Sequence, residues 1–87
     1  MKPRFPLGRT VATSGAISLG IDLVRYLRRH HCSDWGDLFH DDKQANEDAL
    51  LKGDLILSCY LLHNDQTIYI ITECDRSSTC VMLSEEY

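Results

Sequence analysis

Two apolar runs in the second half of the chain, separated by a short polar cluster, predict a β-hairpin. The runs lie within residues 54–74 and are rich in Leu, Ile and Tyr, and the cluster HNDQ at 63–66 separates them. Turn-forming residues between two such runs are typical of a hairpin. The first run is apolar on both faces, which favours a central strand or one that is covered on both sides. After the polar turn at 75–79, residues 80–83 predict a third strand and an antiparallel meander.

Residues 21–31 have the spacing of an amphipathic helix. Ile21, Val24 and Leu27 recur at intervals of three residues, Leu23 can join this stripe, and the arginines fall mostly on the other side. Asp22 in the first turn and basic residues in the last turn match the helix dipole. We therefore expect a helix here, with Ile21, Val24 and Leu27 facing the core.

A second helix is expected from Asp41 or Asp42, either of which can be the N-cap, to about Lys52. Gly53 suits the position that follows the last turn. The apolar stripe of this helix consists of three residues, Ala45, Ala49 and Leu50. Two of its acids are expected to point outwards, Glu47 and Asp48.

The first thirteen residues predict an extended N-terminal arm, because Pro3 and Pro6 exclude a helix there. Thr13 or Ser14 can cap a short helical turn that Gly20 ends. The fold class expected from these elements is α+β, in a single compact domain over residues 1–87. It consists of a three-stranded antiparallel β-meander packed with two α-helices, and the arm at 1–13 can add a short fourth strand.

Length and composition suit one small domain with a cytoplasmic location. The chain has 87 residues, of which 44% are hydrophobic and 25% charged. No apolar run approaches the roughly 18 residues of a membrane span. The basic start lacks the apolar segment of a signal peptide, so we expect no membrane association. The four cysteines form no Cys-x-x-Cys pair, and we expect free thiols.

Charge is unevenly distributed along the chain, and the acids gather around the second predicted helix. The net charge is −4, yet the first 31 residues hold six basic residues and one acid, whereas the remainder hold three basic residues and twelve acids. One interpretation of the stretch 34–54 is a capped helix with a solvated face. The other is an anionic surface that docks on a basic groove of a partner, including a groove that normally holds nucleic acid.

Trp35 is the only tryptophan and lies between Asp34 and Gly36, away from the apolar stripes. It suits an interface anchor, although it can also close the core under the second helix. The predicted partner-binding set is Asp34, Trp35, Asp37, Asp41, Asp42, Glu47 and Asp48.

The other candidate sites are weaker. Ligand-capable residues between 30 and 42 lack the two short-spaced pairs of a zinc site, so we expect neither metal nor cofactor. We assign no catalytic residue, because Cys32 has only sequence neighbours as partners and no nucleophile elbow or phosphate loop is present. Arg76 either clamps a carboxylate or phosphate or pairs with a carboxylate such as Asp75 and holds its turn.

Four stretches carry a resemblance to a known family: FPLGRTVATSGAISLG, HHCSDWGDL, NEDALLKG and IYIITECDRSSTCVMLSEEY. Together they resemble a family of small bacterial proteins of unknown function associated with plasmids and other mobile elements. The resemblance covers nearly the whole chain, and its most distinctive motifs are DWGD at 34–37 and DRS at 75–77. It implies a mobile-element context, in which small acidic proteins are similar in size and charge to inhibitors of host defence nucleases.

We therefore expect a non-enzymatic protein-interaction module, in one form an acidic anti-defence inhibitor that mimics nucleic acid. The expected partner is a protein with a basic surface, and the chain itself is expected to be a monomer or a small homo-oligomer. The first alternative is a nucleic-acid-associated accessory protein that uses the basic helix at 21–31, although an acidic chain is not typical of such proteins. The second alternative is a small hydrolase around Cys32 or Arg76.

Overall fold

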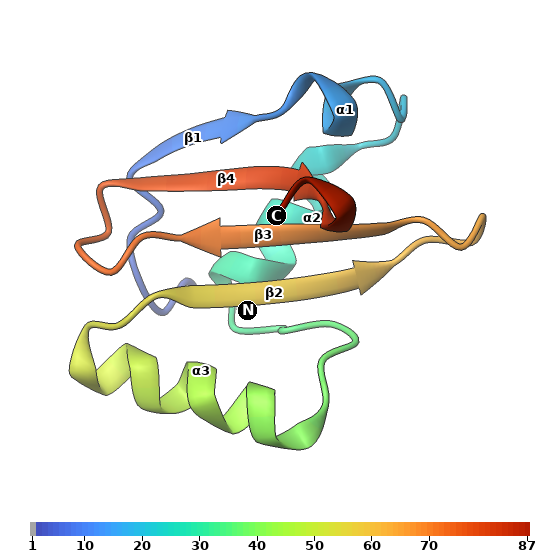
Figure 1. Cartoon of the computed structure of the whole chain (residues 1–87). Coiled ribbons are helices and arrows are strands. Elements are labelled where there is room, and N and C mark those ends of the chain that lie inside the picture. Colours follow the sequence, from blue (N-terminus) through green and yellow to red (C-terminus); the bar gives the residue numbers. More distant parts are fainter. Residues whose placement is uncertain (1) are drawn as a thin grey trace.

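A four-stranded mixed sheet with the order β1-β4-β3-β2 forms the centre of the structure, a computed structural model that describes residues 2–87 (Figure 1). The strands are β1 (Arg9–Ala12), β2 (Ile56–Leu61), β3 (Thr67–Thr72) and β4 (Ser78–Leu83). The helices are α1 (Ser14–Ile17), α2 (Leu23–His31) and α3 (His40–Lys52), and a 3-10 turn, η1 (Ser84–Glu86), follows β4.

The predicted antiparallel meander is confirmed, but the complete sheet is mixed. β2 pairs with β3 and β3 pairs with β4, both antiparallel. The N-terminal arm adds the fourth strand, β1, which lies parallel to β4 with Arg9 opposite Ser78. The purely antiparallel architecture with two helices is therefore corrected to a mixed sheet with three helices. A parallel pair needs a long crossover, and the three helices and the hairpin between β1 and β4 supply it.

One face of the sheet packs on α2, which lies behind the sheet in Figure 1. The buried strand residues on this inner face include Tyr60, Ile70 and Val81. The predicted helix is present and its inward face is partly the predicted one: Leu23 and Leu27 pack on the core, whereas Val24 is 53% exposed. The helix also turns His30, which has no exposed surface, into the core. This part of the inward face was missed because the sequence does not show that a polar residue occupies an inward position.

The helix α3 runs beside β2 (Figure 1) and starts earlier than expected. Its N-cap is Phe39, which makes no side-chain cap bond, so the assignment of Asp41 or Asp42 as N-cap is wrong. Both acids lie instead in the first turn, where they suit the helix dipole. Gly53 ends the helix in the left-handed conformation (φ 76°), as predicted.

The small helix α1 is capped by Thr13, whose Oγ1 accepts a hydrogen bond of 3.1 Å from the Ala16 N–H. This confirms one of the two expected caps. In α3, the predicted stripe residue Ala45 is exposed, whereas Ala49 is buried. Ala49 belongs to a second small core that also contains Phe5, Trp35 and Ile56. This second core ties α3 and the N-terminal arm to the sheet.

Candidate functional site

The edge of β2 is closed by groups from α3 and from the acidic loop before it. Asn46 of α3 donates to the Leu57 carbonyl at 2.6 Å and accepts from the Leu57 N–H at 3.1 Å. The loop at 35–37 pairs with Cys59, whose N–H donates to the Trp35 carbonyl. Of the two expectations for this strand, the central position is thus wrong. β2 is an edge strand, and its free polar groups are paired by Asn46 and by the loop.

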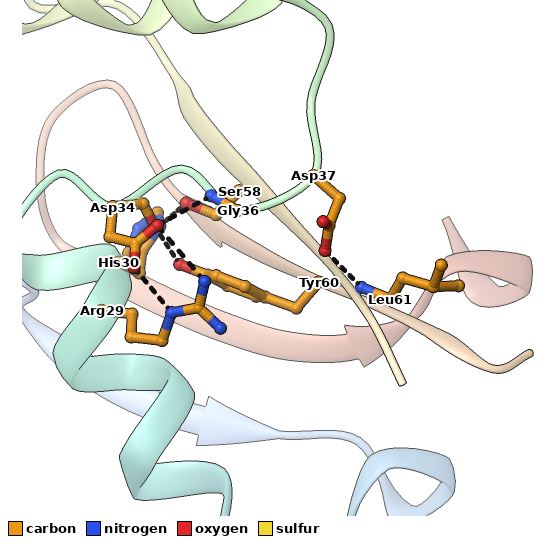
Figure 2. Close-up of polar contacts among 8 residues, drawn as sticks. All are labelled: Arg29, His30, Asp34, Gly36, Asp37, Ser58, Tyr60 and Leu61. Carbon is orange, nitrogen blue, oxygen red and sulfur yellow. Dashed lines mark hydrogen bonds and ion pairs between the residues drawn. The ribbon is translucent and has the colours of Figure 1, made fainter. Parts of the chain in front are cut away.

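Asp37 and Gly36 explain why an acidic loop lies so close to a strand. The Oδ2 atom of Asp37 accepts the Leu61 N–H at 2.8 Å, and its own N–H donates to the Cys59 carbonyl at 2.7 Å (Figure 2). Gly36 has a φ of 78°, and a Cβ atom there would overlap the Cys59 carbonyl. Asp37 is therefore exposed but has a structural role as a mimic of the next strand.

Asp34, another member of the predicted docking set, is bound within the fold. The Arg29 Nε atom donates to the Asp34 Oδ2 atom at 2.7 Å, and the Gly36 N–H donates to Asp34 Oδ1 at 3.2 Å (Figure 2). The hydrogen bond from Arg29 holds the pKa of Asp34 below its usual value. The guanidinium group of Arg29 also lies 4.7 Å from the ring centroid of Tyr60, whose hydroxyl donates to the Asp34 carbonyl. This cluster fastens the C-terminal end of α2 to β2.

Trp35 and Glu47 form a second internal link. Trp35 is 4% exposed and its Nε1 atom donates to Glu47 Oε2 at 2.9 Å. Arg4 binds the same carboxylate through both terminal nitrogens, at 2.9 and 3.1 Å, and lowers the pKa of Glu47. Trp35 thus closes the core, which was one of its two predicted roles. Glu47 points only partly outwards: its side chain is 38% exposed, and it links α3 to the N-terminal arm.

Four members of the predicted set are exposed: Asp37, Asp41, Asp42 and Asp48. Asp48 accepts a hydrogen bond of 3.2 Å from Gln44 on the same helix. The structure therefore divides the predicted set: Asp34, Trp35 and Glu47 make internal contacts, Asp37 binds β2 while staying exposed, and the other three acids are exposed on α3. The four exposed acids are the members that can meet a partner directly.

Arg76 fixes a turn, but it does so through backbone carbonyls and not through the expected carboxylate. Its terminal nitrogens donate to the carbonyls of Asp54 (2.7 Å), Glu73 (3.1 Å) and Ala49 (3.1 Å). A cation at the last carbonyls of α3 is also favoured by the helix dipole. Asp75 accepts the Ser77 N–H at 3.0 Å, as turn residues commonly do. The structure thus favours the structural role for both residues.

A buried polar chain, which the sequence analysis missed, crosses the inner face of the sheet. His30 contacts Ser58 through Nδ1 at 2.5 Å and Thr72 through Nε2 at 2.9 Å. Thr72 contacts Thr79 at 2.7 Å, and Thr79 donates to the Leu7 carbonyl at 2.7 Å. The carbonyl can only accept, so Thr72 donates to Thr79 and His30 Nε2 donates to Thr72. Ser58 then donates to Nδ1 of a neutral imidazole, in agreement with burial lowering the pKa of His30 to about 3.

This His30–Ser58 pair resembles a nucleophile and its base, but it is not placed for catalysis. Neither side chain has any exposed surface, so a substrate cannot reach the hydroxyl. The sequence signal that could have located the chain is the set of polar residues at alternating inner-face positions of the strands, Ser58, Thr72 and Thr79. This row of hydrogen-bonded side chains joins α2, three strands and the N-terminal arm.

A small pocket of about 360 Å³ lies at the C-terminal end of α2 and is lined by Pro3, Arg28, Arg29, His31 and Cys32. It brings two guanidinium groups and an imidazole to one place. Arg29 is partly neutralised there by Asp34. In the described residues no hydrogen bond joins Cys32 to His31.

The other face of the sheet carries apolar side chains that no long helix covers (Figure 1). We call this surface the open face, and its apolar residues are Val11, Leu57, Cys59, Leu61, Tyr69, Ile71, Cys80 and Met82, of which Ile71 is buried. Leu61 is 60% exposed and Val11 43% exposed. A groove of about 300 Å³ lies where the open face meets α3, and its lining includes Leu57, Tyr69 and Asp42. Contiguous apolar surface of this kind is typical of protein-interaction sites.

Exposed carboxylates gather at the end of the open face where β2 and β4 finish. The contact of Asp37 with Leu61 places the start of α3 at this end, the β2–β3 turn lies there, and η1 follows β4. We call these carboxylates the acidic rim, and they are Asp41, Asp42, Asp65, Glu85 and Glu86. The open face and the acidic rim together offer apolar contact next to negative charge.

Within residues 2–87, no group of three or more His, Cys, Asp or Glu side chains is arranged to hold a metal ion. In the same part of the chain, no helix combines the length and apolarity needed to cross a membrane. Comparisons with protein-family models, with curated proteins and with solved structures find no match to this chain.

Proposed function

We propose that this protein is a non-enzymatic protein-interaction module that docks through its open face and acidic rim. The observation that carries the proposal is the apolar sheet face that no long helix covers, on which Leu61 is 60% and Val11 43% exposed, together with the groove where this face meets α3. Leaving such a surface in water is unfavourable, by about 25 cal/mol for each Å² of apolar area. A partner that covers it recovers this free energy.

Charge selects the kind of partner. The acidic rim lies beside the open face, and Asp42 belongs to the lining of the groove itself. A segment with an apolar stripe flanked by Lys and Arg therefore complements both parts of the surface. The apolar stripe supplies burial, and the basic flanks supply orientation and a faster association.

The finer proposal is an anti-defence inhibitor that docks on a basic groove of its partner, in the cytoplasm. Its support is the resemblance to mobile-element proteins together with the exposed acids of α3, Asp41, Asp42 and Asp48. The four free cysteines suit a reducing compartment, since one of them, Cys74, is exposed. Because Arg29 binds Asp34 and Arg4 binds Glu47, the anionic surface is smaller than the acid content of the stretch 34–54 indicates.

The test uses the whole chain as bait in a host-cell extract, with two variants that differ only in position. Leu61→Lys places a charge on the open face, and Leu51→Lys is the matched control, because Leu51 is 89% exposed on α3 and outside the open face. We expect the wild type and Leu51→Lys to retain one partner that Leu61→Lys loses. For that partner, Asp41→Lys with Asp42→Lys should slow association about tenfold at low salt and much less at high salt. Binding that is equal in all four proteins would contradict the proposal.

One observation supports a second function, that of a nucleic-acid-associated accessory protein. The pocket at the end of α2 brings Arg28, Arg29 and His31 together, and these groups can contact phosphates. Fluorescence anisotropy with labelled single- and double-stranded oligonucleotides at several salt concentrations tests it. Salt-dependent binding that Arg28→Glu removes, and that Leu61→Lys leaves unchanged, would favour this function over docking through the open face.

A further inference from the structure

The two edges of the sheet are treated differently by the fold. The edge of β2 is occupied by Asn46 and by the loop at 35–37. At the other edge, β4 is the one strand that neighbours β1 within residues 2–87 (Figure 1). Natural proteins usually protect an exposed edge, because its unpaired N–H and C=O groups can pair with another chain. The structure therefore protects one edge with several groups and leaves the other available.

The pairing of β1 with β4 identifies the groups on the free edge. The Arg9 N–H donates to the Ser77 carbonyl and the Thr13 N–H donates to the Val81 carbonyl, both at 3.0 Å. Successive residues of a strand point their backbone groups to opposite sides, so the odd-numbered residues of β1 face β4. The N–H and C=O groups of Thr10 and Ala12 consequently point away from the sheet. None of these four groups has a hydrogen-bond partner within residues 2–87.

We propose that two copies of this chain pair through β1, antiparallel across a two-fold axis at Val11, to form a continuous eight-stranded sheet. In this register Thr10 of each copy lies opposite Ala12 of the other, so all four outward groups of each strand are paired. The Val11 side chains, each 43% exposed in the single chain, then meet at the axis. Registers centred on Thr10 or on Ala12 would use Gly8 or Ser14, which lie outside the strand.

Charge complementarity supports a second copy as the occupant. In the same register Arg9 of one copy lies opposite Thr13 of the other, with both side chains on the same side of the sheet. Thr13 already holds Glu86, because its Oγ1 donates to Glu86 Oε1 at 2.7 Å. The Leu83 N–H donates to the same oxygen, also at 2.7 Å, which leaves Glu86 Oε2 without a hydrogen bond in the described part of the chain. The exposed Arg9 of one copy thus comes beside the second copy's Glu86, and the symmetry makes this pairing twice.

This proposal differs from docking through the open face, because its backbone hydrogen bonds come from the edge of the sheet, and it shares only Val11 and Glu86 with the docking surface. A short strand with one ion pair on each side predicts a modest affinity. Dimerisation should therefore depend strongly on concentration in the range from micromolar to millimolar. The open faces of the two copies would become continuous across β1.

The experiment is sedimentation equilibrium of the full chain, combined with amide hydrogen exchange of Thr10 and Ala12 by nuclear magnetic resonance. We expect a monomer–dimer equilibrium and amides whose exchange slows as the protein concentration rises. Thr10→Pro removes an outward N–H without removing a bond to β4, and should weaken dimerisation at least about tenfold. Circular dichroism shows whether this variant remains folded.

Arg9→Glu provides a second variant that does not alter the backbone. It places a carboxylate beside the second copy's Glu86, so it should also weaken dimerisation by about tenfold or more at low salt. The matched control is Arg25→Glu, which makes the same charge reversal on the exposed surface of α2 and should leave dimerisation unchanged. A chain that is monomeric at every concentration overturns the proposal, and so does a dimer that Arg9→Glu and Arg25→Glu weaken equally.

Discussion

Replacing Asn46 tests whether the closed edge of β2 stabilises the fold. The Asn46 side chain is 5% exposed and makes two hydrogen bonds with the backbone of Leu57, at 2.6 and 3.1 Å. In Asn46→Ala both bonds are lost, and the Leu57 N–H and C=O groups lose their partner at a site that α3 partly shields from water. Each lost bond costs about 1–1.5 kcal/mol, and more if the stranded group stays dry.

The higher helix propensity of alanine offsets only a small part of this loss. Alanine is a better helix former than asparagine by about 0.6 kcal/mol, which offsets part of the loss. The expected net destabilisation is about 1.5–2.5 kcal/mol, a large part of the roughly 5–10 kcal/mol expected for a domain of this size. A loss of this size should lower the melting temperature by about 10 °C or more.

Urea unfolding followed by circular dichroism measures this change, and amide exchange of Leu57 reports the edge directly. Gln44→Ala is the matched control, because Gln44 is an exposed polar residue two positions earlier on the same helix. It should change the free energy of unfolding by no more than about 0.5 kcal/mol. If Asn46→Ala is no more destabilising than Gln44→Ala, the edge-closing role assigned to Asn46 is wrong.

Three further predictions concern the core and the thiols. Burial lowers the pKa of His30 to about 3, whereas the ordinary pKa of histidine is 6.5. Below pH 6.5 the unfolded chain therefore binds more protons than the folded one. The free energy of unfolding should fall by up to about 1.4 kcal/mol per pH unit as the pH drops from 6.5 towards 3. Urea unfolding at several pH values between 6.5 and 5 should show this slope in the wild type and lose it in His30→Gln, and equal slopes would count against the neutral imidazole. Trp35→Ala should cost about 3–5 kcal/mol in the same assay, since the ring is 4% exposed, and a cost below about 1 kcal/mol would contradict its place in the core. All four cysteines should react with a thiol reagent in denaturant without prior reduction, and fewer than four reactive thiols would reveal a disulfide. In the native state Cys74 should react before Cys59 and Cys80, because burial raises the pKa values of these two thiols.

The parts of the fold that the sequence predicted correctly depend on neighbouring residues. The hairpin follows from two apolar runs around the turn at 63–66, and the end of α3 follows from Gly53. Thr13 as a cap of α1 and the burial of Ala49 are local in the same sense. Each of these features is determined by backbone preference or by periodicity within a few residues, which a single sequence shows directly.

The errors occur where residues distant in the chain meet. Periodicity placed Val24 inside and gave no reason to bury His30, whose partners on β2 and β3 are far away in sequence. The acidic stretch indicated one anionic surface, but Arg29 binds Asp34 and Arg4 binds Glu47. Whether a carboxylate faces a partner protein or its own chain depends on which cation the fold brings within hydrogen-bond distance.

The sequence alone determined the α+β class, the antiparallel meander, the main helices and the uneven charge. Only the tertiary structure decided that β1 lies parallel to β4, that β2 is an edge closed by Asn46 and Asp37, and that an apolar face stays open. The physical reason is that hydrophobic burial is non-directional, so an apolar pattern shows that a surface is to be covered but not by what. Hydrogen bonds are directional, and their partners become known only when the backbone groups are in place.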